Sequence, residues 1–256
     1  SVTILPGDPS ALTSLLEGNG LGKTIVAGVE GSVRVVPLDT YSNMAQLSKS
    51  QLMEYSLEIA DENGTQITQD PQKLIFSSLD GSHVGTYVLT KAAKYVITVR
   101  QQDGLVVGGG AVNVEVVPSE VVVSKTKIEV ATHSVAVGQT GSVLVVLRDE
   151  NDNVIVKDLG EDLGLVLTNP SKVLSSSLGD VKLSFANGTY NATFSTTFAG
   201  SYEVSVQVFG VGVTATQAVS FVPEAPFALT TIARLAGNGL GVAGDKNVIL
   251  IEGRDK

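Results

Sequence analysis

A short pattern recurs three times in this chain and sets the size of its folding units. Each copy reads Val, any residue, a large apolar residue, an aliphatic residue and Pro, at residues 2–6, 114–118 and 219–223. The copies lie about 110 residues apart, which is too long for a solenoid repeat and suits a whole small domain. Residues 31–36 also return in similar form at residues 141–146. We therefore predict the tail of a preceding repeat in residues 1–8, two full repeats at 9–118 and 119–223, and the start of a third, truncated repeat at 224–256, as expected for a piece of a longer protein.

Most of the chain alternates between apolar and polar residues. Every second residue is apolar in residues 95–99 and 202–208, and this period of two places one set of side chains in a core. Turn signals such as Asn187-Gly188 separate the runs. Residues 44–60 are ambiguous, and we expect a loop or short helix that enters a strand near Met53. Short strands without alternating helices predict an all-β fold of tandem antiparallel β-sandwiches.

Composition excludes several classes of protein. The 256 residues are 43% hydrophobic and 17% charged, enough to bury two ordinary cores. No apolar run reaches the ~18 residues of a membrane helix, so we expect no membrane insertion by this fragment. The net charge of −9 argues against nucleic acid as a partner, because phosphate binding requires clustered Lys and Arg. The chain has no Cys, and therefore no disulfide or thiolate metal site.

The titratable residues do not suggest catalysis. The two histidines, His83 and His133, fall in different repeats without a repeated partner, and we expect both at the surface. The carboxylates are scattered over turns and outward strand faces. A catalytic site needs convergent acid, base or nucleophilic groups. We therefore predict no catalytic residues, no enzyme activity, no cofactor and no small-molecule substrate.

One acidic stretch suggests a metal. Residues 149–153 read Asp-x-Asn-Asp-Asn, which resembles the calcium-binding linker of cadherins. Calcium prefers several oxygen ligands from a short flexible loop, which makes candidates of Asp149, Asn151, Asp152 and Asn153. The stretch lies well inside a predicted repeat rather than between two repeats. We therefore favour a solvated turn in which the Asp and Asn side chains bond the local backbone.

The second repeat resembles a known family. Residues 187–194 contain Gly-x-Tyr with a second aromatic residue four positions on, and residues 200–202 contain another Gly-x-Tyr. These features, with Ala225-Pro226-Phe227, resemble filamin-type immunoglobulin-like repeats; the first repeat matches less closely because its two tyrosines, Tyr87 and Tyr95, lie closer together. Bacterial immunoglobulin-like adhesin repeats are the nearest competing family. Both resemblances imply an immunoglobulin-like antiparallel β-sandwich.

The filamin resemblance also implies a binding mode. In that family a partner peptide adds as a strand beside strands C and D of the sandwich, using an unpaired sheet edge. The matching positions here are Leu163, Leu165, Leu167, Val173 and Leu174. A place in the hydrophobic core is the favoured interpretation of these side chains.

Three Asn-x-Ser/Thr sequences, at Asn63, Asn187 and Asn191, are candidate N-glycosylation sites. Low charge with abundant Ser, Thr, Val and Gly favours a cell-surface or extracellular protein over a cytoplasmic, cytoskeletal one. We therefore expect a structural or adhesive module, serving cell–cell or gamete recognition or spacing binding surfaces, with protein partners through self-association or a surface receptor. The alternative is an intracellular filamin-like scaffold that crosslinks actin. Fold alone does not decide between them.

Overall fold

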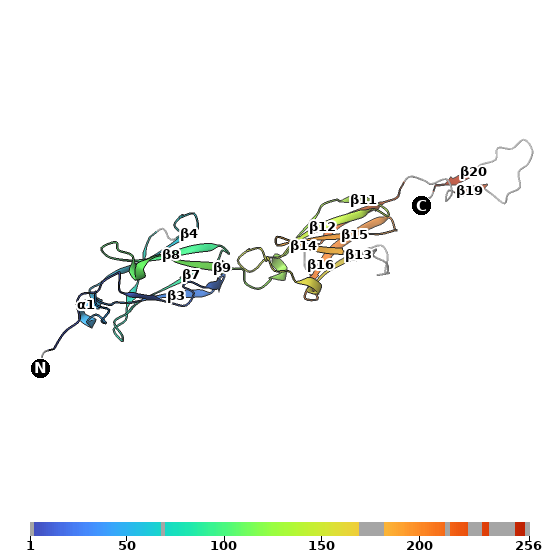
Figure 1. Ribbon diagram of the computed structural model, residues 1–256. Helices are drawn as coiled ribbons and strands as arrows, with labels where there is room; N and C mark the ends of the chain where they lie inside the picture. The colour runs from blue at the N-terminus through green and yellow to red at the C-terminus, as the bar shows by residue number, and fades with distance from the viewer. Residues whose placement is uncertain are drawn as a thin grey trace, which may run out of the picture. The chain divides into compact units, whose positions relative to one another are not determined.

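The computed structural model describes residues 3–67, 70–168, 182–212, 216–224, 232–235 and 249–253. Two compact units make up the chain: one is Ser1–Val121 with Arg148–Ile155, and the other is Val122–Leu147 with Val156–Lys256. The four segment boundaries expected from the repeated pattern stay a prediction. Figure 1 shows strands in each unit and little helix, so the predicted all-β class is confirmed.

The first sandwich packs a sheet of order β1-β3-β7-β6 against a sheet of order β2-β9-β8-β4-β5. Neighbouring strands are antiparallel except for β2 and β9, which run parallel. A short helix, α1, precedes β4, as predicted for residues 44–60, and a 3-10 turn, η1, precedes β9. The bounds are β1 Leu15–Glu17, β2 Thr24–Val26, β3 Glu30–Val36, α1 Leu47–Gln51, β4 Tyr55–Asp61, β5 Gln72–Lys73, β6 Ile75–Phe76, β7 His83–Val88, β8 Lys94–Gln101, η1 Val107–Gly109 and β9 Val112–Val117.

The second sandwich follows the same plan. One sheet has the order β10-β12-β15-β14 and the other β11-β18-β16-β13, with β17 paired to β16. Strands β11 and β18 run parallel, as β2 and β9 do. A separate two-stranded sheet, β19 with β20, follows. The bounds are η2 Val123–Lys125, β10 Lys127–Val130, β11 Ser134–Ala136, β12 Thr140–Val146, η3 Gly160–Asp162, β13 Leu163–Thr168, β14 Lys182–Ala186, β15 Thr189–Ser195, β16 Gly200–Val208, β17 Val211–Gly212, β18 Gln217–Val222, β19 Ile232–Leu235 and β20 Ile249–Glu252.

The predicted alternation places the correct faces in the two cores. In β8 the side chains of Tyr95, Ile97 and Val99 are buried, and in β16 those of Tyr202 and Val204 are buried. Successive side chains of a strand point to opposite faces of the sheet, so these residues form one inward row in each sandwich. Burial of such rows is the main favourable contribution to the stability of a sandwich.

A tyrosine near the start of the same strand, β8 or β16, closes the preceding corner in both sandwiches. The hydroxyl of Tyr95 donates to the carbonyl oxygen of Lys91 at 2.9 Å, and that of Tyr202 donates to the carbonyl oxygen of Phe198 at 3.0 Å. In each case the acceptor lies four residues upstream of the ring. This is the tyrosine corner of sandwich folds. It explains why the similar segments 95–99 and 202–206 both begin with Tyr.

The glycine at the second position of β3 and of β12 also has a structural reason. Gly31 of β3 pairs with Tyr87 of β7, and Gly141 of β12 pairs with Phe194 of β15. A Cβ atom at Gly31 would overlap the Tyr87 ring, and one at Gly141 would lie 2.8 Å from Phe194. The aromatic ring therefore occupies the space of the missing side chain.

The prediction that both histidines lie at the surface is correct for His133 and wrong for His83. His83 begins β7 and is only 2% exposed. Its Nε2 donates to the carbonyl oxygen of Ser50 at 2.9 Å, and its ring packs edge-on against Tyr55, with 4.7 Å between ring centroids. The turn ends one residue before His83, so the alternation of β7 directs this side chain inward with Tyr87. Burial lowers the pKa of His83, and the hydrogen bond to Ser50 opposes that effect.

Candidate functional site

The candidate calcium ligands form a tight turn around the carboxylate of Asp149, which is fully buried. One oxygen of that carboxylate accepts the backbone N–H groups of Asn151 and Asn153, each at 2.8 Å. The other accepts the backbone N–H of Ser119 at 2.9 Å and the side-chain amide of Asn153 at 2.8 Å. Burial raises the pKa of Asp149, but these hydrogen bonds outweigh it and the net pKa is lowered.

The same turn occurs around Asp39 in the first sandwich. Its carboxylate accepts the backbone N–H groups of Tyr41 and Asn43 on one oxygen, and on the other the N–H of Gly7 at 2.8 Å and the side-chain amide of Asn43 at 3.1 Å. The hydrogen bond from Gly7 is the largest cause that lowers the pKa of Asp39 to about 2. The turn residues Ser42 and Asp152 both have positive φ, 65° and 63°. We name these segments, 39–43 and 149–153, the Asp–Asn turns.

This geometry explains the acidic stretch without a metal. Each oxygen of Asp149 already accepts two N–H donors, which is the capacity of a carboxylate oxygen. Asn153 directs its amide N–H toward Asp149 and toward the carbonyl oxygen of Thr90. Within the described residues no group of three or more His, Cys, Asp or Glu side chains could hold a metal ion. A local turn remains the favoured interpretation of this motif.

The candidate partner groove lies at the edge strand β13. Leu163 and Leu167 are buried in the core and Leu165 is half-buried, which agrees with the core interpretation. The inner edge of β13 pairs with β16, and among the described strands none pairs with its outer edge. The remaining candidates, Val173 and Leu174, lie outside the described residues, as do Ala225-Pro226-Phe227. The structure therefore brings together part of the predicted groove.

The three candidate glycosylation residues are all accessible. Asn63 lies in the turn after β4, Asn187 in the turn between β14 and β15, and Asn191 on the exposed face of β15. Their use by a glycosylating enzyme stays a prediction.

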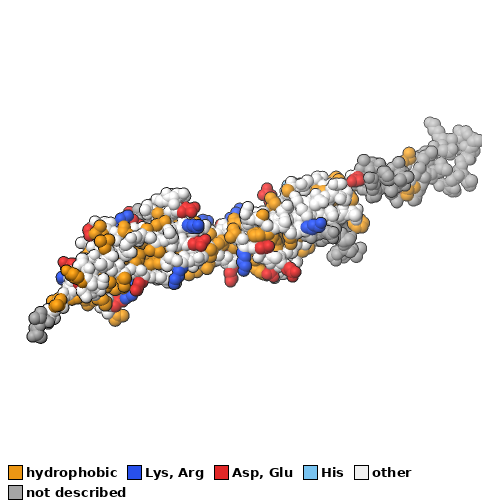
Figure 2. All heavy atoms as spheres, viewed as in Figure 1, with side chains coloured by type: hydrophobic (Ala, Val, Ile, Leu, Met, Phe, Trp, Pro, Cys, Tyr) orange, Lys and Arg blue, Asp and Glu red, His pale blue; other side chains and the backbone are white. Residues whose placement is uncertain are grey.

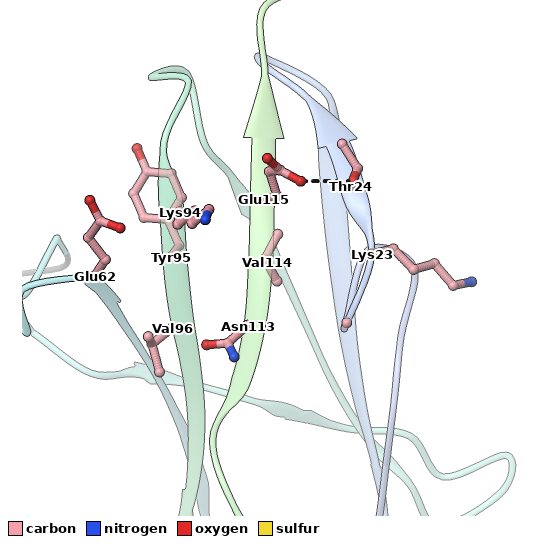
Figure 3. A pocket seen from close by; sticks show the side chains of 10 residues that line it. Lys23, Thr24, Glu62, Lys94, Tyr95, Val96, Asn113, Val114 and Glu115 are labelled. Carbon is pink, nitrogen blue, oxygen red and sulfur yellow. Dashed lines mark hydrogen bonds between the residues drawn. The ribbon is translucent and has the colours of Figure 1, made fainter.

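A hollow of about 470 Å³ lies on the outer face of the first sandwich over β2, β8 and β9. Figure 3 shows the side chains of Thr24 and Glu115, both in its lining, pointing toward each other, and the Thr24 hydroxyl lies 3.4 Å from a Glu115 oxygen. Lys94 and Asn113 come from neighbouring strands. Lys23, Glu62, Lys94 and Glu115 give the lining charges of both signs.

The face of the molecule seen in Figure 2 is chemically mixed. On the face shown in Figure 2, hydrophobic, basic and acidic side chains are interspersed over both units, and the basic ones stand singly. Within the described residues no helix is long and apolar enough to cross a membrane.

Comparison with known proteins identifies the fold. No family model and no curated protein matches the chain. Among solved structures, FdeC, an adhesin of Escherichia coli, is 17% identical with a TM-score of 0.60 over 98% of this chain and 76% of its own. Invasin, a bacterial integrin-binding protein, is 17% identical with a TM-score of 0.53, covering 91% of this chain and 44% of its own. InvD of Yersinia pseudotuberculosis is 16% identical with a TM-score of 0.51, covering 89% and 64%.

Both sandwiches are immunoglobulin-like repeats. The strand orders, the tyrosine corners and the similarity to these adhesin structures agree on this fold, which confirms the predicted tandem immunoglobulin-like sandwiches. In the naming of that fold, β1-β3-β7-β6 are strands A, B, E and D, and β2-β9-β8-β4 are strands A′, G, F and C. The turn favoured from the sequence around Asp149 is present, but it is buried rather than solvated, because Ser119 and Thr90 bond to it. The same turn around Asp39 was not predicted, although the shared spacing of Asp39 with Asn43 and of Asp149 with Asn153 is visible in the sequence.

Proposed function

We propose that this chain is a non-enzymatic adhesive or spacer part of a longer, multi-repeat protein at the cell surface. The observation that carries the proposal is the tandem immunoglobulin-like fold. Its strongest candidates for a ligand site, the two Asp–Asn turns, use their carboxylates to hold the backbone of the turn. Among the described residues, their carboxylates accept N–H groups of the chain itself. The fold similarity to FdeC and invasin supports the adhesive role. Cell–cell recognition, with gamete recognition as one instance, and self-association or a surface receptor as the mode of binding are the finer forms of this proposal.

Labelling and attachment measurements test this role. An antibody raised against this chain is expected to label intact cells that express the parent polypeptide. Deletion of residues 9–223 from that polypeptide is expected to reduce attachment of the cells to their target surface. A matched deletion of equal length elsewhere in the parent controls for a general loss of surface display. Labelling that requires permeabilised cells would reject the cell-surface role.

A second candidate function is the binding of partner peptides by strand addition in an intracellular actin-crosslinking scaffold. The outer edge of β13, which pairs with none of the described strands, favours it. Co-sedimentation of the parent polypeptide with actin filaments, together with labelling only after permeabilisation, would support this candidate. Glycans on Asn63, Asn187 or Asn191 in native material, detected by mass spectrometry, would oppose it, because N-glycans are attached in the secretory pathway.

A further inference from the structure

In both Asp–Asn turns the Asp carboxylate accepts backbone N–H groups of the same turn. The turns differ in burial: Asn153 is buried and Asn43 is exposed. In the turn 149–153, Asn153 is only 7% exposed. Its side-chain oxygen accepts the N–H of Ala92 at 2.9 Å, and its amide donates to the carbonyl oxygen of Thr90 at 2.8 Å. Lys91 adds a third hydrogen bond, from its ammonium group to the carbonyl oxygen of Asn151 at 3.0 Å. Residues 90–92 are the corner that precedes strand F, so one corner covers this turn within the first compact unit.

The turn 39–43 has the same hydrogen-bonding groups, but among the described residues no corner packs over it. Asn43 is exposed, and within the described part of the chain its side chain bonds only to Asp39. Beside it, Tyr41 and Met44 are largely exposed. The side-chain oxygen of Asn43 and the carbonyl oxygen of Tyr41 occupy the positions that Ala92 and Lys91 bond in the other turn. The turn 39–43 therefore presents hydrogen-bonding groups flanked by exposed apolar side chains. These groups correspond to the ones that residues 90–92 bond in the turn 149–153.

The segment that leads into this turn indicates what the partner is. Residues 3–6 repeat the pattern of residues 115–118, two aliphatic residues followed by Pro, so Ile4 corresponds to Val116 of strand G. Val116 is 3% exposed in the core of the first sandwich, whereas Ile4 is 89% exposed. Gly7 enters the turn 39–43 by the same hydrogen bond that Ser119 makes to Asp149. Residues 3–5 therefore carry the pattern of a last strand without the sandwich that would bury it.

We infer that the turn 39–43, with Tyr41 and Met44, is the docking surface for the corner before strand F of a further immunoglobulin-like repeat that precedes residue 3 in the same polypeptide. That corner supplies a backbone N–H to the side-chain oxygen of Asn43, a carbonyl oxygen to its amide and a basic side chain to the carbonyl oxygen of Tyr41. The same repeat buries Ile4 in its core. This inference rests on the multi-repeat part of the proposed function and not on where that protein resides or what it binds.

Hydrogen exchange of this chain and of the parent polypeptide, which includes the residues upstream of Ser1, tests the inference. Residues 41–44 are expected to exchange at least about tenfold more slowly in the parent, because covered amides require a larger opening. Residues 151–154 are the internal control and are expected to exchange alike in both proteins. Equal exchange of residues 41–44 in both, or a parent whose upstream residues form no such repeat, would overturn the inference. Concentration-dependent protection in this chain alone would assign the surface to a second copy instead and would also overturn it.

Unfolding midpoints of variants provide a second test that does not depend on hydrogen exchange. Tyr41→Ser changes an exposed side chain, so it is expected to leave the unfolding midpoint of this chain unchanged and to lower that of the parent. Asn43→Ala is expected to lower the midpoint of the parent more than that of this chain, whereas Asn153→Ala is expected to lower both equally. Equal effects of Tyr41→Ser in the two proteins would contradict the docking surface, while leaving the attachment and labelling results, and the proposed function, untouched.

Discussion

The two immunoglobulin-like repeats share their strand order and differ at the edge formed by strand C. In the first repeat β5 covers the outer edge of β4, where Ser56 pairs with Lys73 and Leu57 with Gln72. In the second repeat none of the described strands covers β13. An unpaired edge presents free backbone donors and acceptors to other chains. The same fold therefore closes one site of strand addition with its own chain and, within the described residues, leaves the equivalent site without a partner.

The repeats also differ in the aromatic residues of their cores. The first places His83 between Tyr55 and Phe76, with ring centroids 4.7 and 5.3 Å away. The second places Phe221 against Phe194 and Tyr202, with centroids 6.0 and 5.4 Å away. One core therefore contains a buried imidazole ring, whereas these core contacts of the other join phenyl and phenol rings. The comparison teaches that a shared topology does not require shared core chemistry.

The largest expected effect tests the tyrosine corner that the repeats share. Tyr202→Ala removes a buried ring and the hydrogen bond to Phe198, and is expected to lower the free energy of unfolding of the second repeat by ~3–5 kcal/mol. Tyr95→Ala is expected to do the same to the first repeat. Gln207→Ala on the exposed face of β16 is the control and is expected to stay within about 0.5 kcal/mol. Denaturant melts measure all three, and equal small losses would show that the facing of β16 is wrong.

The paired glycines provide the next comparison. Gly31→Ala and Gly141→Ala are each expected to lower the free energy of unfolding of their repeat by ~1–3 kcal/mol, because a methyl group must displace the ring of Tyr87 or Phe194. Gly31→Ala is expected to cost more, since its Cβ overlaps the ring more closely. Gly104→Ala is not a suitable control, because Gly104 has a φ of 84°. Gly110→Ala is a better one, since nothing lies within 4 Å of its Cβ position and its φ is 168°. Larger loss at Gly141 would contradict this order.

The buried histidine predicts different acid sensitivity in the two repeats. Burial lowers the pKa of His83 in the folded state, so the unfolded state binds a proton more readily. Stability of the first repeat is therefore complete above the ordinary pKa of ~6.5 and falls as the pH decreases below it, by at most about 1.4 kcal/mol per pH unit. Urea melts at pH 7.5 and 5.5 measure the loss. An NMR titration of His83 with an ordinary pKa would refute the prediction.

The smallest expected effect compares two turns of the second repeat. Asn187-Gly188 and Phe209-Gly210 each place two residues in the positive φ region, at 49° and 77° and at 53° and 76°. Asn tolerates this conformation and an aromatic residue does not, so Phe209→Asn is expected to raise the free energy of unfolding by about 1 kcal/mol. Asn187→Phe is the reciprocal change and is expected to lower it. A thermal melt measures both, and a loss on Phe209→Asn would show that its half-exposed ring contributes packing that outweighs the strain.

Sequence alone determined the repeated sandwich and the inward rows of its strands. Alternation is a local property, so Tyr95 and Tyr202 could be placed in cores without knowledge of their neighbours. Local turn chemistry likewise placed Asn63 and Asn187 at accessible turns.

Only the tertiary structure decided the features that depend on pairing between distant segments. The burial of His83 could be predicted only from the facts that β7 begins at this residue and that its ring bonds the carbonyl oxygen of Ser50. The role of Asp149 depended on Ser119 and Thr90, which are far away in the chain. The contrast between a covered Asn153 and an exposed Asn43 could not be read from the sequence, because the two turns have the same residue spacing. Contacts across the fold, rather than local preference, decide which of two similar segments is buried.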